Sequence, residues 1–78
     1  MLISNLNEII ADCLMVSEDE IKSDTELNSI PTWDSMAHMM MVSSIEEKYD
    51  VLFTGDEIAE MSHVHKIRDI LISKGIRN

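Results

Sequence analysis

Residues 34–49 read DSMAHMMMVSSIEEKY, and this stretch decides the fold class. Its apolar residues recur at steps of three and four, which is the spacing of one face of an α-helix. Asp34 and Ser35 are both good N-caps and Pro31 lies just upstream, so a helix is predicted from this dipeptide to about Lys48. Its predicted buried face holds Val42, Ile45 and Tyr49, with Met41 and His38 beside them.

The segments on either side predict two more main helices and one short one. Helical spacing predicts a helix over about residues 4–15, a short turn over 56–61, and a last helix that Ser62 caps and Gly75 follows as the C′ residue. Their expected core positions, with those of the connections, are Ile3, Leu6, Ile10, Cys13, Val51, Phe53, Ile58, Met61, Val64, Ile67, Ile70 and Leu71.

Residues 17–33 are rich in helix-breaking residues and form a long connection. Ser17 and Glu20 have the spacing of a capping box, so one short helical turn is expected at the start. The sequence has only two Gly and one Pro, too few for the many tight turns of an all-β fold. The prediction is an all-α fold, a small bundle of three main helices plus a short third helix, with a long ordered loop between the first and second helices. The loop is expected to bury Ile21, Leu27 and Ile30.

Length and charge limit the class of protein further. The 78 residues carry 15 acidic side chains against six Lys and Arg, a formal net charge of −9. One domain over residues 1–78 is expected, most simply a monomer. The charge argues against nucleic acid and against an anionic membrane surface, and favours a basic protein partner. With one cysteine, no signal peptide and no apolar run long enough to insert into a membrane, a cytoplasmic location is expected.

The dipeptide Asp34-Ser35 is the best candidate in the sequence for a chemically modified site. A serine at the start of a helix lies beside unsatisfied backbone N–H groups, and a phosphate attached to it would lie at the positive end of the helix dipole. On the local sequence alone, the simpler interpretation is that these residues only cap the helix.

The chain as a whole resembles the acyl carrier protein family, whose carrier domain binds phosphopantetheine. The resemblance covers nearly the whole length, and an Asp-Ser-apolar run followed ten residues later by Ile-Glu-Glu in a short acidic chain is fairly specific. The matching segments are Trp33–Met36, Ile45–Val51, Asp56–Ile58 and Met61–Ile67, with Ile21–Leu27 similar to the family's loop before the carrier serine.

This resemblance implies a non-catalytic carrier that a phosphopantetheinyl transferase modifies. Ser35 would carry a covalent 4′-phosphopantetheine arm taken from coenzyme A, and Asp34 would help to place the serine. The thiol of the arm would hold acyl or aminoacyl groups as thioesters for acyl-loading and acyl-accepting enzymes. The partner-binding residues implied are Trp33, Met36, Met39, Met40, Glu46, Glu47, Asp56 and Glu60.

The chain departs from the family's pattern after the serine. Ala37, His38 and Met40 occupy positions where several members carry acids, and Trp33 replaces a small residue. These differences favour a specialised pathway of lipid or secondary-metabolite biosynthesis over housekeeping fatty-acid synthesis. Trp33 is expected either to contact the arm or a partner, or to pack down onto the loop. The rival hypothesis is a small helical adaptor that binds a partner through the Met36–Met40 surface, with Ser35 only a cap.

Other sites are disfavoured by the sequence. Asp34, Ser35 and His38 are triad residue types, but 78 residues scarcely provide a substrate cleft and an oxyanion hole. His63 and His65 are two positions apart, so on a helix they would point to different sides, and no metal site is expected.

Overall fold

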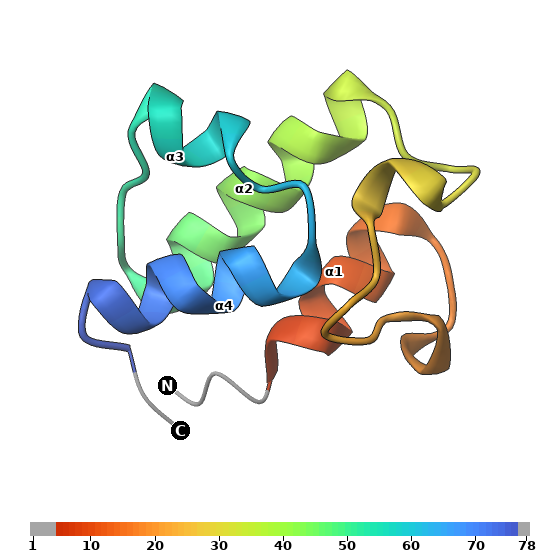
Figure 1. The fold of residues 1–78 in the computed structure, drawn as a ribbon, viewed down its shortest axis with the longest axis horizontal. Coiled ribbons are helices and arrows are strands. Elements are labelled where there is room, and N and C mark those ends of the chain that lie inside the picture. Colours follow the sequence, from red (N-terminus) through yellow and green to blue (C-terminus); the bar gives the residue numbers. More distant parts are fainter. Residues whose placement is uncertain (1–4, 77–78) are drawn as a thin grey trace.

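The computed structural model describes residues 5–76 and contains four α-helices (Figure 1). They are α1 (Leu6–Leu14), α2 (Ser35–Tyr49), α3 (Gly55–Ala59) and α4 (Val64–Ser73). Two 3₁₀ turns, η2 (Glu18–Glu20) and η3 (Leu27–Ser29), lie in the connection between α1 and α2. Over residues 5–76 no β-strand forms, and a single antiparallel bridge joins Glu26 to His63. The predicted all-α fold is confirmed, while Ile3 lies outside the described residues.

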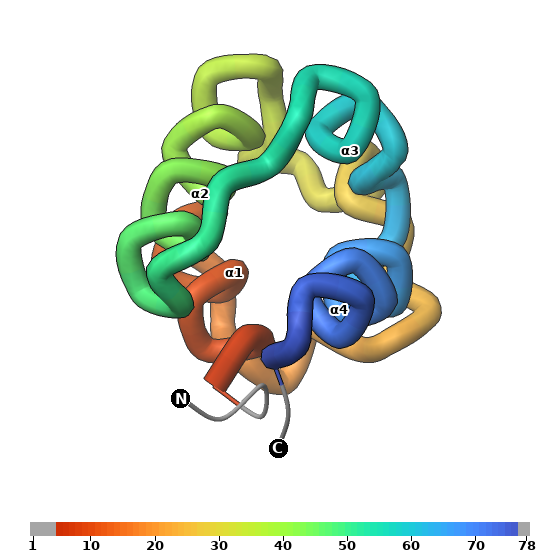
Figure 2. Tube along the Cα trace, turned by 90° about the vertical axis from the view of Figure 1, so that its left-hand side faces the viewer, coloured from red at the N-terminus to blue at the C-terminus, as the bar shows by residue number. Residues whose placement is uncertain are grey.

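The helices surround one apolar core (Figure 2). Helix α1 packs beside α2, and α4 lies across the core from α2 (Figure 2). The predicted core positions of α2 and Met41 are buried, whereas Val51, Ile58, Ile70 and Cys13 are only half-buried at the edge of the core. No helix within residues 5–76 has the length and apolar character that crossing a membrane requires.

The connection before α2 is held against the start of α4. Ile21, Leu27 and Ile30 are all buried, as predicted, and Ser17 and Glu20 form the predicted capping box. The carbonyl oxygens of Ser23 and Thr25 accept the N–H groups of His65 and Val64, at 2.9 and 3.1 Å. The loop therefore supplies acceptors that a helix otherwise takes from its N-cap side chain.

The predicted cap of α4 is wrong for this reason. The N-cap is His63, and it makes no side-chain capping bond. The hydroxyl of Ser62 instead lies 2.9 Å from Nδ1 of His63. At the other end, Gly75 has φ of +93° and follows the helix at C′, where its N–H donates to Ile72 and that of Ile76 to Leu71. These two bonds make a Schellman motif, which fits the expected role of Gly75.

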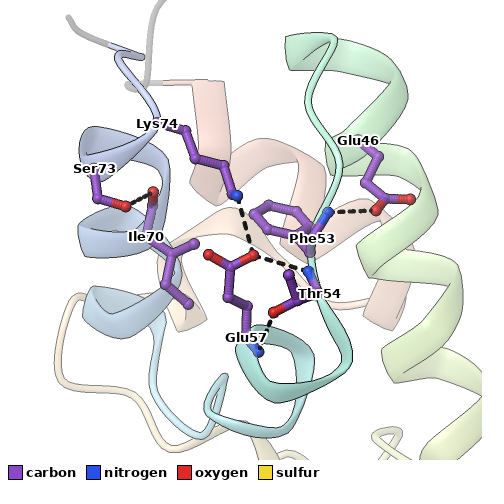
Figure 3. A network of polar contacts seen from close by, with 7 residues as sticks. All are labelled: Glu46, Phe53, Thr54, Glu57, Ile70, Ser73 and Lys74. Carbon is purple, nitrogen blue, oxygen red and sulfur yellow. Dashed lines mark hydrogen bonds and ion pairs between the residues drawn. The ribbon is translucent and has the colours of Figure 1, made fainter.

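Helix α3 is short and is anchored by polar contacts on both sides (Figure 3). The Thr54 hydroxyl accepts the Glu57 N–H, and Oε1 of Glu57 accepts the Thr54 N–H and lies 3.0 Å from Nζ of Lys74 (Figure 3). These contacts, first of all the Thr54 N–H bond and then that to Lys74, lower the pKa of Glu57. The Phe53 N–H donates to Oε2 of Glu46 at 2.9 Å, which ties the segment before α3 to α2.

Candidate functional site

Ser35 is the first residue of α2 and is exposed. Asp34 is the N-cap, and its Oδ1 accepts the Ala37 N–H at 2.7 Å while its carbonyl accepts the His38 N–H at 2.9 Å. The first turn is therefore fixed by Asp34, not by the Ser35 hydroxyl. A group attached to Ser35 would reach solvent directly at the positive end of a 15-residue helix.

Trp33 packs down beside the start of α2. Its half-buried ring lies edge-on to the His38 ring, with 5.8 Å between centroids, and its Nε1 donates to Nδ1 of His38 at 3.2 Å. Because indole is only a donor, Nδ1 must accept, which puts the imidazole proton on Nε2. Nε2 lies 3.1 Å from the Ile58 carbonyl and so donates to it. His38 thus connects Trp33 to α3.

A groove of about 470 Å³ opens beside Ser35, between α2 and α3. This volume lies in the usual range of small-molecule sites. Ser35 lies at its edge, and most of its wall is apolar. The wall is built by Trp33, His38 and Met39, by Gly55, Ile58 and Ala59 of α3, by Leu27 of the long connection, and by Met61.

The three predicted surface methionines of α2 are all exposed, at 73% for Met36, 49% for Met39 and 57% for Met40. They do not form one surface. Met39 lines the groove beside Ser35, whereas Met36 and Met40 line a separate depression towards α1. Helix geometry separates Met39 from Met40, because consecutive residues lie about 100° apart around an α-helix. Met39 therefore lies on the side that lines the groove with α3, and Met40 on the side of the second depression.

The four acidic residues predicted to contact partner enzymes lie in two separate places and differ in exposure. Glu47, Asp56 and Glu60 are exposed, but Glu46 is half-buried and its Oε2 is taken by the Phe53 N–H. Glu46 and Glu47 lie near the far end of α2, about 17 Å along the axis from Ser35 at 1.5 Å per residue. Asp56 and Glu60 instead lie on and after α3, close to the groove wall that Gly55 and Ala59 form.

The side chains of Asp34, Ser35 and His38 do not form a triad. Both ring nitrogens of His38 are engaged, by Trp33 and by the Ile58 carbonyl, so neither is left to take a proton from Ser35. No three of the His, Cys, Asp and Glu side chains within residues 5–76 gather in a way that could hold a metal ion.

The prediction that the side chains of His63 and His65 point to different sides of a helix is wrong. Their ring centroids lie 5.3 Å apart, because His63 has the extended φ and ψ of an N-cap (−129° and 154°) and is not yet in the helix. Nε2 of His63 lies 3.7 Å from a Glu26 carboxylate oxygen. His63 therefore lies between Glu26 of the long connection and His65 of α4.

Three residues that line the groove have no site role in the sequence-based prediction. The sequence predicts Ile58 and Met61 as core positions and His38 beside the buried face of α2, and all three also line the groove. The short predicted turn over residues 56–61 is the sequence feature that indicates a groove wall. A helix of five residues leaves Ile58 only half-buried, beside the groove.

Comparison with models of known protein families and with curated proteins finds no significant match.

Proposed function

We propose that this chain is an acyl carrier protein of a specialised pathway, with 4′-phosphopantetheine attached to Ser35. The observation that carries the proposal is the position of Ser35, which is exposed at the start of α2 and at the edge of an apolar groove. An enzyme can reach this hydroxyl without unfolding any part of the chain.

The helix start supports a phosphodiester at this point. Asp34 satisfies the N–H of Ala37 with its own carboxylate, and no hydrogen bond within residues 5–76 engages the N–H groups of Ser35 and Met36. Free N–H groups at a helix start favour an anion, by roughly 0.3–1 kcal/mol at an exposed site.

The groove supports an acyl group as the cargo. An arm on Ser35 can fold its thioester end back towards Met39 and Ile58, where an acyl chain would leave water. Each buried methylene contributes about 0.8 kcal/mol, so even a short chain gains from this position. The chemistry would lie in the thiol of the arm, and the protein itself needs no catalytic group.

The acidic surface supports brief encounters with basic enzymes. Glu47, Asp56 and Glu60 are exposed, and no Lys or Arg pairs with them among the described residues. Unpaired surface charge increases the rate of association more than it increases affinity. Partner enzymes would include the transferase and the enzymes that load and accept the acyl group.

The proposal is tested by transfer of a fluorescent pantetheine from a labelled coenzyme A by a broad-specificity phosphopantetheinyl transferase. The wild type should gain one label and Ser35→Ala none, whereas Ser43→Ala, which changes an exposed serine further along α2, should label normally. Labelling that survives Ser35→Ala would contradict the proposal. Absence of labelling in the wild type would favour the adaptor hypothesis, in which Ser35 is only part of the helix start.

A further inference from the structure

The groove beside Ser35 has one wall that differs from the rest. Helices α2 and α3 line it mainly with apolar side chains, such as Met39 and Ile58. Where the long connection meets the start of α4, a carboxylate, an amide and a hydroxyl also line the groove. We call the three residues that carry these groups the polar wall: Glu26, Asn28 and Ser62.

Backbone contacts hold the polar wall in place. The Leu27 N–H donates to the Ser62 carbonyl at 2.9 Å, and Glu26 pairs with His63 in the antiparallel bridge. The carbonyl of Glu26 also accepts the Ser29 N–H at 3.0 Å. Because these bonds use the main chain of Glu26, its carboxylate is not required to keep the connection against α4.

The Glu26 carboxylate has acceptor positions left for a ligand. Its side chain is 53% exposed, and its contact with Nε2 of His63 is 3.7 Å long. A charge-assisted N–H···O bond is about 2.7–2.9 Å long, and a carboxylate offers about four lone-pair sites. Asn28 and Ser62 are exposed as well. A donor that enters the groove can therefore reach acceptors on this wall.

Charge determines which ligand the wall fits. Among residues 5–76, Glu26 is the one Asp, Glu, Lys or Arg that lines the groove. An anionic group would be repelled there, in a chain of net charge −9. An apolar chain end would cover part of the carboxylate without giving it a hydrogen bond, which costs free energy. An ammonium group brings the opposite charge and three donors.

We infer that the cargo of this carrier is a short acyl group whose far end carries a cationic amine, and that Glu26 determines this specificity. The inference rests on the proposed function, since an arm on Ser35 brings the cargo to the groove. The methylenes of the cargo lie against Met39 and Ile58, and the ammonium group meets the polar wall. Apolar sides with one charged group are the usual pattern of a specific small-molecule site.

The test compares two arms that differ in one group. The 5-aminopentanoyl and hexanoyl groups have the same length, and they end in an ammonium and a methyl group. A phosphopantetheinyl transferase attaches each loaded arm to Ser35 from the matching coenzyme A analogue. An amide replaces the thioester, because the amine would otherwise cyclise onto the carbonyl. Intact mass verifies attachment, and urea unfolding gives the equilibrium constant for unfolding of each form.

Glu26→Gln should raise the unfolding constant of the aminopentanoyl form about threefold more than that of the hexanoyl form, which is the size expected of a partly exposed charge pair. Glu18→Gln is the matched control. Glu18 is an exposed glutamate of the same connection that does not line the groove, so its substitution should change the two forms equally.

Equal effects of Glu26→Gln on the two forms would overturn the inference. The same threefold difference with a 5-hydroxypentanoyl arm in place of the aminopentanoyl arm would also overturn it, because hydrogen bonding without charge would then explain the effect. A chain to which neither arm becomes attached would contradict the proposed function together with this inference. Attachment without a difference that depends on Glu26 would contradict the inference alone, so the two failures are distinguishable.

Discussion

The indole Nε1 of Trp33 donates a hydrogen bond to Nδ1 of His38 at 3.2 Å. The opposite nitrogen of His38 lies 3.1 Å from the carbonyl oxygen of Ile58, so one imidazole connects the end of the long connection, α2 and α3. Trp33, His38 and Ile58 all line the groove beside Ser35. Helix α3 has only five residues and cannot be stable alone, so its position depends on such contacts.

Loss of the indole donor should weaken this connection. Trp33→Phe keeps an aromatic ring but leaves Nδ1 of His38 without its partner, and we expect a loss of about 0.5–1.5 kcal/mol in the free energy of unfolding. The measurement is urea unfolding followed by circular dichroism. In a His38→Ala background the same substitution should cost less, because the partner is already gone. An equal cost in both backgrounds would show that the two rings do not interact.

Met39 and Met36 should respond differently to cargo, if the carrier proposal holds. Loading Ser35 with an octanoyl thioester should stabilise the chain, because each methylene that enters the groove contributes about 0.8 kcal/mol, and two buried methylenes would give about 1.6 kcal/mol. Met39→Gln should reduce this gain, because Met39 lines the groove, and Met36→Gln should leave it unchanged. Urea unfolding of the loaded and unloaded forms measures the difference. Equal gains in both variants would argue against the groove as the acyl site.

Glu46 should matter more to the fold than its neighbour. Glu46→Ala removes the acceptor of the half-buried Phe53 N–H, and we expect a loss of about 1–2 kcal/mol in stability. Glu47→Ala is the matched control, because Glu47 is exposed and surface changes usually cost less than about 0.5 kcal/mol. Equal unfolding free energies for the two variants would show that Glu46 does not stabilise the fold. Glu46 would then be only one of the acidic partner contacts that the resemblance implies.

Glu57 should make stability depend on acid. Its hydrogen bonds with Thr54 and Lys74 hold its pKa below the ordinary value of 4.5, so its contribution is present above that pH and is lost as the pH falls through the lower pKa of the folded chain. Unfolding free energy measured between neutral and acidic pH should therefore fall less steeply in Glu57→Gln than in the wild type. Glu60→Gln, at an exposed position next to α3, should keep the wild-type slope. Identical slopes in Glu57→Gln and the wild type would contradict the assignment.

The sequence predicted the local features of this fold well. Steps of three and four located α2 and its buried residues Val42 and Ile45, and the spacing of Ser17 and Glu20 located the first turn of the long connection. These signals depend on neighbouring residues only, so they survive in the structure.

The contacts between distant segments could not be read from the sequence. Ser62 is a good capping residue, yet the carbonyls of Ser23 and Thr25 serve the start of α4. Likewise, nothing near Glu46 predicts that Phe53 donates to it, and nothing near Met15 predicts that it lies beside Met36. Each of these contacts joins parts of the chain that only the packing of the helices brings together.

The central claim is that Ser35 carries a phosphopantetheine arm, and intact-mass analysis tests it most directly. The chain is incubated with coenzyme A and a broad-specificity phosphopantetheinyl transferase, beside a control carrier. We predict that the mass of the wild type increases by one phosphopantetheine, that fragmentation places the addition on Ser35, and that Ser35→Ala keeps its helical circular dichroism but gains nothing. A wild type that stays unmodified under conditions that modify the control carrier would contradict the account.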